Sequence, residues 1–400
     1  MSRKPAQNSF VSLFSGCGGF DLGLQRAGFD AVMGFDACPD AVSHYQRHVC
    51  PHAEVADLRE ELAELPKAEV VIAGPPCQGF STAGKRDLGD HRNHLLTLAG
   101  RIATSIQPKV VMIENVWAAK AGAHGKYWTE LEEHFRDVGY KSHTLRCDAS
   151  QLGLAQSRRR LLLVAWKSRS EPDFDGIAQS LAAPSGRLDE VLGGVEGLPN
   201  HAPEALAPAS RDYRIAQRIG PGQKLSNVRG GPRSIHTWNI PEVFGPTTAA
   251  ECRLLEFVMR GRRQERRRDF GDADPVSTER LTMEFGRQTE KLVGSLLAKG
   301  YLRMVGDDFD LCHTFNGKYR RFQWEDKACA VDTRFGEAQL FLHPNEHRPF
   351  TVREAARIQD FPDHFDFTCN KRTAFRLIGN AVPPRMGELA ARCAKKALGR

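Results

Sequence analysis

A single cysteine stands in a loop of prolines and glycines, Gly74-Pro75-Pro76-Cys77-Gln78-Gly79-Phe80-Ser81. The loop follows a short apolar run at 70–73, which we expect to be a buried β-strand. The prolines stiffen the loop, and the glycines leave room for a bulky planar substrate. A thiol at the carboxyl end of a parallel strand lies where α/β sheets bind ligands, so Cys77 is a candidate nucleophile. A buried structural cysteine is the alternative interpretation.

Charged side chains adjoin two further apolar runs. Glu114 ends one run. A carboxyl group in apolar surroundings can hold a proton and donate it to a substrate. A cap on the next helix is the alternative role for Glu114. Three consecutive arginines precede another run. Because side chains alternate along an extended chain, Arg158 and Arg160 point to one face and Arg159 to the other. We expect at least one of them to reach the cleft beside Cys77, a solvated surface being the alternative.

A glycine-rich turn, FSGCGG at residues 14–19, follows an apolar run and precedes an amphipathic stretch. Glycines there let the backbone approach a ligand closely. The turn departs from the dinucleotide pattern G-x-G-x-x-G at Asp21, so pyrophosphate binding is not favoured. Asp36 ends the next run, where a carboxylate can hold a ribose diol, and Asp57-Leu58 could bind an adenine amino group. Together they predict a nucleoside-containing cofactor without phosphates; a tight packing turn beside solvated carboxylates is the alternative.

A sheet must bring these side chains to one edge. Short apolar runs, separated by helical patterns, are expected as strands at 8–14, 31–35, 70–73, 109–113 and 160–166. Strands alternating with helices imply βαβ units, a parallel sheet and right-handed crossovers. The predicted fold class is therefore α/β, with a doubly wound Rossmann-like sheet and a smaller second domain.

Composition sets outer limits on function. The chain has 400 residues, 56 Lys+Arg against 49 Asp+Glu, a net charge of +7 and 41% hydrophobic residues. That charge is weak evidence for a nucleic-acid partner. No apolar run is long enough to span a membrane, and the N-terminus has no secretory h-region. The ten cysteines form no Cys-x-x-Cys pair, so we expect no metal site, no disulfide framework, reduced thiols and a cytoplasmic protein.

Composition and hydrophobic periodicity change along the chain and divide it into three parts. We expect a catalytic, cofactor-binding domain at residues 1–169, a target-recognition domain at 170–345, and a C-terminal segment at 346–400 that completes the catalytic domain. The stretch 168–210 is rich in Pro, Gly, Ala and Ser and is expected to be a linker or loop-rich boundary.

The middle part carries patterns of its own. Residues 251–268 hold seven arginines against three acids, which suits phosphate or guanine contact, whereas a solvated helix face is the alternative. The segments 277–285, 288–299 and 301–311 read as a helix-turn-helix with a wing, the hairpin turning at Gly306. A packed helical insertion is the alternative. Replacing Arg262 and Arg263 would test a DNA role.

Taken together, these segments resemble the cytosine-C5 DNA methyltransferase family. The matching pieces occur in the family's usual order and cover residues 10–166 and 346–395: FSGCGG, Asp36, Asp57, GPPCQGFS, DHRNHLL, ENV, QSRRR, RPFTVREAARIQDFPD and GNAVPPRMGELAA. The resemblance implies transfer of a methyl group from S-adenosylmethionine to carbon 5 of a cytosine flipped out of double-stranded DNA, and a mobile loop at 81–93 that could close over the base.

The resemblance also assigns roles. Cys77 would be the nucleophile, Glu114 the pyrimidine clamp and proton donor, and Arg158 and Arg160 the groups that steady the cytosine and the backbone. The cofactor would be held by Phe14, Ser15, Gly16, Gly18, Gly19, Asp36, Asp57, Leu58, Pro75, Asn380 and Val382. Three positions depart from the family's commonest pattern, with a possible effect on cofactor affinity: Asp36 replaces Glu, Ser15 replaces Ala, and Ala381 replaces Ser.

Three functions fit to different degrees. The first is an active DNA methyltransferase, expected to be a monomer, of a restriction-modification system or an orphan enzyme. The second is a tRNA-directed relative, but neither that group's Cys-Phe-Thr signature nor its small recognition region is found here. The third is a catalytically silent DNA-binding paralogue, against which the intact Cys77, Glu114, Arg158 and Arg160 argue.

Overall fold

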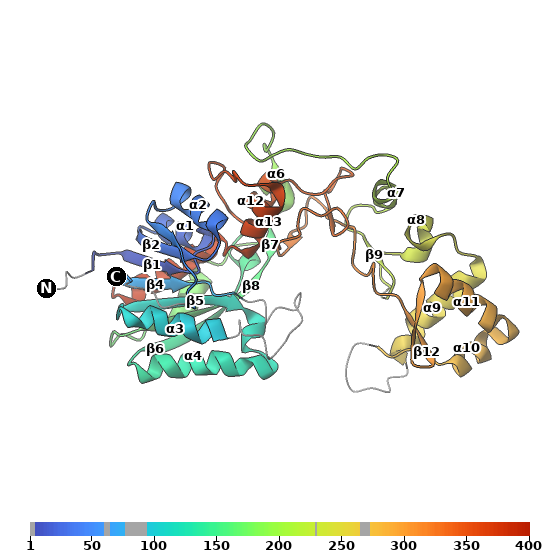
Figure 1. Ribbon diagram of the computed structural model, residues 1–400, viewed down its shortest axis with the longest axis horizontal. Helices are drawn as coiled ribbons and strands as arrows, with labels where there is room; N and C mark the ends of the chain where they lie inside the picture. The colour runs from blue at the N-terminus through green and yellow to red at the C-terminus, as the bar shows by residue number, and fades with distance from the viewer. Residues whose placement is uncertain (1–4, 60–64, 77–93, 229, 265–272) are drawn as a thin grey trace. The chain divides into compact units, whose positions relative to one another are not determined.

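Contacts within the chain separate two units in the computed structural model, which describes residues 5–59, 65–76, 94–228, 230–264 and 273–400. Unit 1 comprises residues 1–202, 324–334 and 351–400, and unit 2 comprises residues 203–323 and 335–350. Figure 1 shows the elements of both units, which are described separately below.

A seven-stranded sheet with the order β3-β2-β1-β4-β5-β8-β6 forms the centre of unit 1. Its strands are β1 (Ser9–Leu13), β2 (Asp30–Asp36), β3 (Ala53–Val55), β4 (Val70–Ala73), β5 (Val110–Val116), β6 (Lys141–Asp148) and β8 (Arg159–Trp166). Strands β1 to β5 run parallel to one another, which confirms the predicted α/β fold class. Strand β8 runs antiparallel to both β5 and β6, so the expectation that the run at 160–166 extends a purely parallel sheet was wrong.

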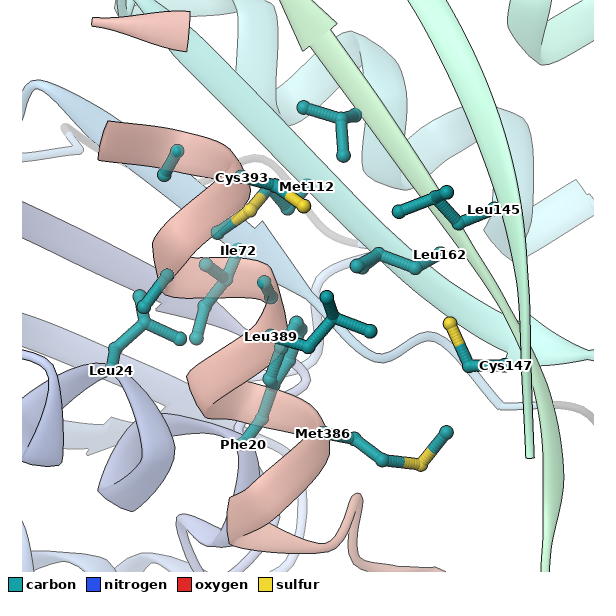
Figure 2. Packing of buried hydrophobic residues seen from close by; sticks show 14 of the residues in the cluster. Phe20, Leu24, Ile72, Met112, Leu145, Cys147, Leu162, Met386, Leu389 and Cys393 are labelled. Carbon is teal, nitrogen blue, oxygen red and sulfur yellow. The ribbon is translucent and has the colours of Figure 1, made fainter. Parts of the chain in front are cut away.

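The apolar side chains of the central strands alternate between the two faces of the sheet. On one face, Phe10, Ile72 and Met112 pack with helices α1 (Gly19–Arg26) and α14 (Pro384–Ala397), as Figure 2 shows for Ile72 and Met112 beside Leu389 and Cys393 of α14. On the other face, Val11, Val71 and Val111 pack with α3 (Leu95–Ser105) and α4 (Gly125–Asp137). Because both faces are covered, the strands are buried on both sides, as is typical of doubly wound sheets.

The helices of unit 1 include three from the C-terminal part of the chain. They are α1 (Gly19–Arg26), α2 (Pro39–His48), α3 (Leu95–Ser105), α4 (Gly125–Asp137), α5 (Phe174–Ser180), α6 (Leu188–Leu192), α12 (Val352–Ile358), α13 (Lys371–Asn380) and α14 (Pro384–Ala397). Helices α1 and α14 approach closely because glycines face each other: a Cβ on Gly387 would lie 2.3 Å from the Phe20 carbonyl oxygen and 2.9 Å from the Gly23 Cα. The C-terminal segment therefore packs as an integral part of unit 1.

The boundaries of unit 1 differ from the expected domain limits in two places. Residues 170–202 belong to unit 1, although they were expected to form a linker and the start of the recognition domain. The buried Phe174 of α5 packs in the core on the α1 and α14 face of the sheet. Residues 324–334 also belong to unit 1, because β14 (Ala328–Cys329) pairs in parallel with β7 (Gln156–Ser157).

Unit 2 contains the expected helix-turn-helix elements and hairpin. Helices α10 (Thr278–Phe285) and α11 (Thr289–Lys299) precede an antiparallel hairpin of β11 (Leu302–Val305) and β12 (Asp308–Leu311). Helix α9 (Ala249–Gln264) lies before them in the chain, and Val276 forms an antiparallel bridge to Phe309 of the hairpin. These elements share one hydrophobic core, so the order of the predicted module is confirmed. The remaining elements are α7 (Arg211–Gln217), α8 (Pro241–Phe244), β9 (Lys224–Ser226), β10 (Ser234–His236), β13 (Arg320–Arg321) and β15 (Phe341–Leu342).

Candidate active site

The glycine turn between β1 and α1 forms one wall of the candidate site. Phe14, Gly16 and Gly18 have φ angles of 53°, 56° and 93°, so the backbone passes through the left-handed region three times in five residues. A Cβ on Gly16 would meet no atom within 4 Å, so this residue borders open space. A Cβ on Gly18 would lie 2.3 Å from Val49 Cγ2, and one on Gly19 would lie 2.4 Å from the Val382 carbonyl oxygen. Gly16 therefore leaves room for a ligand, whereas Gly18 and Gly19 allow close packing of protein.

Asp36 holds the glycine turn in place from the end of β2. Its two carboxylate oxygens accept backbone N–H groups from Gly16, at 2.9 Å, and from Cys38, at 2.8 Å. Burial raises the pKa of Asp36, and these two N–H donors oppose the rise. A carboxylate oxygen can accept more than one hydrogen bond, so Asp36 keeps capacity for a ligand hydroxyl.

Asp57 and Leu58 follow β3, whose Val55 pairs with Asp36. The carboxylate of Asp57 accepts from Arg59 Nε at 2.9 Å, and this partner lowers the pKa of Asp57 to about 2. Leu58 is buried in the core on the α3 and α4 face of the sheet. Asp57 is therefore an ionised carboxylate beside the strand that ends in Asp36.

One pocket of unit 1 is lined by residues from four distant parts of the sequence. Six of the predicted site residues line it: Phe14, Ser15, Gly16, Glu114, Asn380 and Val382. Five further residues line it that the sequence analysis did not assign to a site: Ser12, Phe20, Asp21, Gly74 and Ala381. The lining residues come from the carboxyl ends of β1, β4 and β5, from the start of α1, and from the end of α13 and the residues after it. Ligands of doubly wound sheets bind at this edge.

Asp21 is the most informative of the residues that the sequence analysis missed. Its side chain is fully buried, its Oδ1 accepts from the Tyr45 hydroxyl at 2.8 Å, and among the described residues its Oδ2 has no hydrogen-bond partner. Burial raises the pKa of Asp21 to about 6. The sequence signal for Asp21 was its departure from the dinucleotide pattern: a carboxyl group replaces a glycine in the first turn of a buried helix.

Glu114 and Arg160 meet on adjacent antiparallel strands. Val116 of β5 is paired with Arg160 of β8, which places Arg160 diagonally across from Glu114 on the same face. Arg160 Nε lies 2.6 Å from Glu114 Oε1, and both side chains are mostly buried. The Oε1 atom has no partner with hydrogen-bond geometry among the described residues, so the contact is an ion pair. A carboxyl and a guanidinium group thus lie together at the edge of the pocket.

The residue after Glu114 ties this strand to the loop that carries Cys77. Asn115 Nδ2 donates to the Pro75 carbonyl oxygen at 3.2 Å, and Asn115 Oδ1 accepts the backbone N–H of Val116. The described part of the loop ends at Pro76; Cys77 and the expected closing loop at 81–93 lie outside the described residues. Asn115 therefore fixes the start of the Cys77 loop against β5.

The arginine triplet divides as the alternation predicts, and each member has different partners. Arg158 is buried, and its guanidinium donates to the carbonyl oxygens of Val331, Gly379 and Ala381 at 2.8 to 3.0 Å. Arg159 is 63% exposed, forms an ion pair with Asp148 and lies over the Trp117 ring. Arg158 thus holds the segment that carries Asn380, while Arg160 reaches Glu114.

The described residues do not meet the requirements of a metal site or of a membrane-spanning helix. Across the described ranges, no three or more His, Cys, Asp or Glu side chains are grouped so that they could hold a metal ion. Within the same ranges, no helix combines the length and apolarity needed to cross a membrane.

Known proteins with similar sequences identify the family. The family model described as C-5 cytosine-specific DNA methylase matches residues 8–218 and 255–396. Type II methyltransferase M.HgiBI of Herpetosiphon aurantiacus is 28% identical over 94% of this chain and 94% of that protein. Type II methyltransferase M.AgeI of Thalassovita gelatinovora is 27% identical over 97% of this chain and 99% of that protein.

Solved structures are similar in fold. A DNA modification methyltransferase encoded within an E. coli prophage superimposes with a TM-score of 0.58 at 20% identity, covering 98% of this chain and 99% of that one. Entamoeba histolytica methyltransferase EhMeth superimposes with a TM-score of 0.53 at 14% identity, covering 99% of each chain. Since the family model spans most of the sequence, the resemblance is confirmed: the chain belongs to the C-5 cytosine-specific DNA methylase family and is a DNA (cytosine-5-)-methyltransferase.

Proposed function

We propose that this enzyme transfers a methyl group from S-adenosylmethionine to carbon 5 of a cytosine flipped out of a specific double-stranded DNA sequence, with Cys77 as the nucleophile. The observation that carries the proposal is the pocket at the carboxyl edge of the sheet, where the glycine turn, Glu114 and Asn380 lie together. The pocket borders the start of the loop that presents Cys77.

The residues at this pocket suit S-adenosylmethionine. Gly16 borders open space that a ligand can fill, and Gly74 lines the same pocket. Asp36 lies where a ribose diol would be held, and the buried Asp21 offers a carboxylate oxygen to the cationic methionine part. The predicted contacts of Phe14, Ser15, Gly18, Gly19, Asp57, Leu58, Pro75, Asn380 and Val382 belong to the same proposal. When bound, S-adenosylmethionine supplies an electrophilic methyl group.

The protein's own part in the chemistry begins with the thiol. Carbon 5 of cytosine is too weak a nucleophile to take a methyl group directly. Addition of the Cys77 thiolate at carbon 6 makes the ring an enamine, which is nucleophilic at carbon 5. Glu114, as the acid, would hydrogen-bond ring nitrogen 3 and the amino group and stabilise the developing charge, with Arg160 beside it. After methylation, water or another base takes the carbon 5 proton, the Cys77 thiolate leaves carbon 6, and ring nitrogen 3 returns its proton to Glu114.

Two further parts of the chain are assigned supporting roles. Arg158 would act through the carbonyl oxygens of Gly379 and Ala381, which flank Asn380 in the pocket wall. Unit 2 would form the target-recognition domain, with the catalytic domain built from the first and last parts of the chain. Within unit 2, the winged module, which consists of α10, α11 and the β11–β12 hairpin, and the arginine-rich helix α9 are the candidate DNA contacts.

The names of the relatives favour one biological setting. M.HgiBI and M.AgeI are named Type II methyltransferases, and they align over nearly their whole lengths. We therefore propose that the chain acts in the cytoplasm on DNA within a restriction-modification system, or as an orphan methyltransferase of the same type. A tRNA substrate is the second candidate and is separated from the first by the experiment below.

The test is methyl transfer in cells and in solution. Bisulfite sequencing of DNA from cells that express the enzyme should show 5-methylcytosine at one recurring sequence, and cells that express Cys77→Ala should show none. Purified enzyme with tritiated S-adenosylmethionine should label duplex DNA. Label on tRNA alone, or on neither substrate, would overturn the proposal.

A further inference from the structure

Unit 2 contains a pocket of about 310 Å³ that is separate from the pocket described above. Arg262 and Arg263 at the end of α9, Lys224 of β9, Arg320 of β13, and His313 line it. The polar side chains of Ser226 and Asn316 also reach its wall, and no Asp or Glu is among its described lining residues. Four arginine or lysine residues therefore line one small volume.

This concentration of charge is local. Between residues 170 and 347, acidic residues outnumber basic ones by two, so the region as a whole is not basic. Like charges at close range repel each other, and such a cluster is stable only where counter-charges or a bound anion offset the repulsion.

A carboxylate in contact with the pocket lining already has ion-pair partners. Asp310 is buried beneath the lining and forms ion pairs with Arg262 and, at 2.7 Å, with Arg303. Arg262 Nη2 also lies 3.1 Å from His313 Nε2. Burial and the two arginines lower the pKa of His313, so a neutral ring can accept this hydrogen bond. Arg262 is thus part of the pocket's framework, and its replacement would test the framework more than ligand contact.

Arg263 and Arg320 differ from Arg262 in this respect. Arg263 is exposed and Arg320 is half-buried. Neither guanidinium has an ion-pair or side-chain hydrogen-bond partner among the described residues of the chain. Each guanidinium offers planar donors that match two oxygens of a phosphate group. The pocket is therefore lined by basic residues, and two arginines at its wall have guanidinium donors that no described residue accepts.

We propose that this pocket binds a phosphate group of the DNA backbone and that Arg263 and Arg320 are the residues that contact it. The inference rests on the proposed function, because DNA is the polyanion that the enzyme must bind. A phosphate contact fixes the register of the recognition unit on the duplex without reading sequence. Arg262, Asp310 and His313 act as positioning residues that hold the end of α9 at the pocket.

The test compares Arg263→Ala and Arg320→Ala with a matched control. Arg218→Ala removes an arginine of unit 2 that is 50% exposed, pairs with Glu242, lies outside α9 and the winged module, and does not line this pocket. Binding of each variant to two fluorescent duplexes, one with the methylated sequence and one with a single base pair changed, is measured from 50 to 200 mM salt. Circular dichroism checks that each variant is folded.

We expect Arg263→Ala and Arg320→Ala each to weaken binding about tenfold on both duplexes, and to reduce the slope of log affinity against log salt by about 1, because one phosphate contact is lost. Arg218→Ala should leave the slope unchanged. Unchanged slopes for Arg263→Ala and Arg320→Ala would overturn the inference. Weakened binding on the methylated sequence alone would also overturn it, because it would indicate a base contact. If the wild-type enzyme neither binds nor methylates DNA, it is the proposed function that fails.

Discussion

Glu114 is the described side chain on which the proposed chemistry depends most directly. Its carboxyl group lies at the pocket beside Arg160, where it can donate a proton to the cytosine ring. Glu114→Gln keeps the size of the side chain but cannot transfer that proton. We expect the rate of methyl transfer in a single turnover to fall by about 10²- to 10⁴-fold, which is the usual worth of a general acid.

Binding measurements separate this effect from damage to the fold. The Kd values of Glu114→Gln for S-adenosylhomocysteine and for duplex DNA should stay within about twofold of wild type, given that one isosteric group has changed. Glu130→Gln, an exposed carboxyl of the same unit, serves as the control and should keep the full rate. A single-turnover rate of Glu114→Gln equal to wild type would exclude Glu114 as the proton donor.

Asp21 predicts an unusual dependence of stability on pH. Its pKa in the folded protein is raised from 3.8 to about 6, so the folded state binds a proton more tightly than the unfolded state. This contribution to the free energy of unfolding is present below about pH 4 and is lost as the pH rises through about 6, by up to about 3 kcal/mol. Relative to Asp21→Asn, the wild type should therefore gain stability as the pH falls from 7 to 4.5.

Urea unfolding of the two proteins at several pH values measures this difference. Asp30→Asn, which removes an exposed carboxyl of the same unit, should follow the wild-type curve. Parallel curves for wild type and Asp21→Asn would show that Asp21 titrates normally.

At the scale of single residues, part of the site was predictable. Residue type and position at the end of a strand indicated Glu114 and the glycine turn, whereas Phe14 and Asn380 were expected from the family resemblance. Glu114, Phe14 and Asn380 line one pocket. The partners of Arg158 were not predictable, since Val331, Gly379 and Ala381 are far away in the sequence and offer only backbone oxygens. Asp21 was visible as an anomaly, but its burial depends on Tyr45 of another helix.

The contact between α1 and α14 is the element on which the shape of the cofactor pocket depends. Gly387 faces the Phe20 carbonyl oxygen and Gly23, so a methyl group there must push the two helices apart. We expect Gly387→Ala to destabilise unit 1 by about 2 kcal/mol or more and to weaken binding of S-adenosylhomocysteine, because Asn380 and Val382 precede α14 in the pocket wall.

A second helix glycine provides the control. A Cβ on Gly294 of α11 would meet no atom within 4 Å, so Gly294→Ala should be neutral or stabilise unit 2 by about 0.5 to 1 kcal/mol. Thermal unfolding of both variants gives the comparison. A Gly387→Ala protein as stable as Gly294→Ala would show that the helices do not require this close approach.

The direction of β8 illustrates what a local pattern cannot determine. An apolar run predicts that a buried strand exists, and β8 is one. Its direction depends on the connection from β6, which contains only a 3₁₀ turn at Ala149–Gln151 and the short β7. A parallel connection needs a longer crossover, so this short link requires antiparallel pairing. In unit 2, by contrast, the helical patterns and the turn at Gly306 are local signals, and α10, α11 and the hairpin were located correctly.

At the scale of the whole molecule, the chain returns to unit 1 twice after leaving it. Residues 351–400 were expected to do so, because the family resemblance places them with the catalytic domain. Residues 324–334 were not, because two residues of β14 pairing with β7 leave no periodic pattern in the sequence. The arginine run at 251–268 also proved heterogeneous: Arg262 is buried in an ion pair, while Arg263 is exposed at a cationic pocket. Charge along a sequence therefore indicates where to look for DNA contacts but not which side chains make them.

The central claim is that the whole enzyme methylates cytosine through a covalent bond to Cys77. Duplex DNA in which every cytosine carries fluorine at carbon 5 tests it most directly, because the proton that must leave after methyl transfer is absent and the adduct cannot break down. Incubation with S-adenosylmethionine should give an SDS-resistant protein–DNA complex, and mass spectrometry of its peptides should place the nucleotide on Cys77. No complex with fluorinated DNA, or an adduct on a residue other than Cys77, would contradict the account.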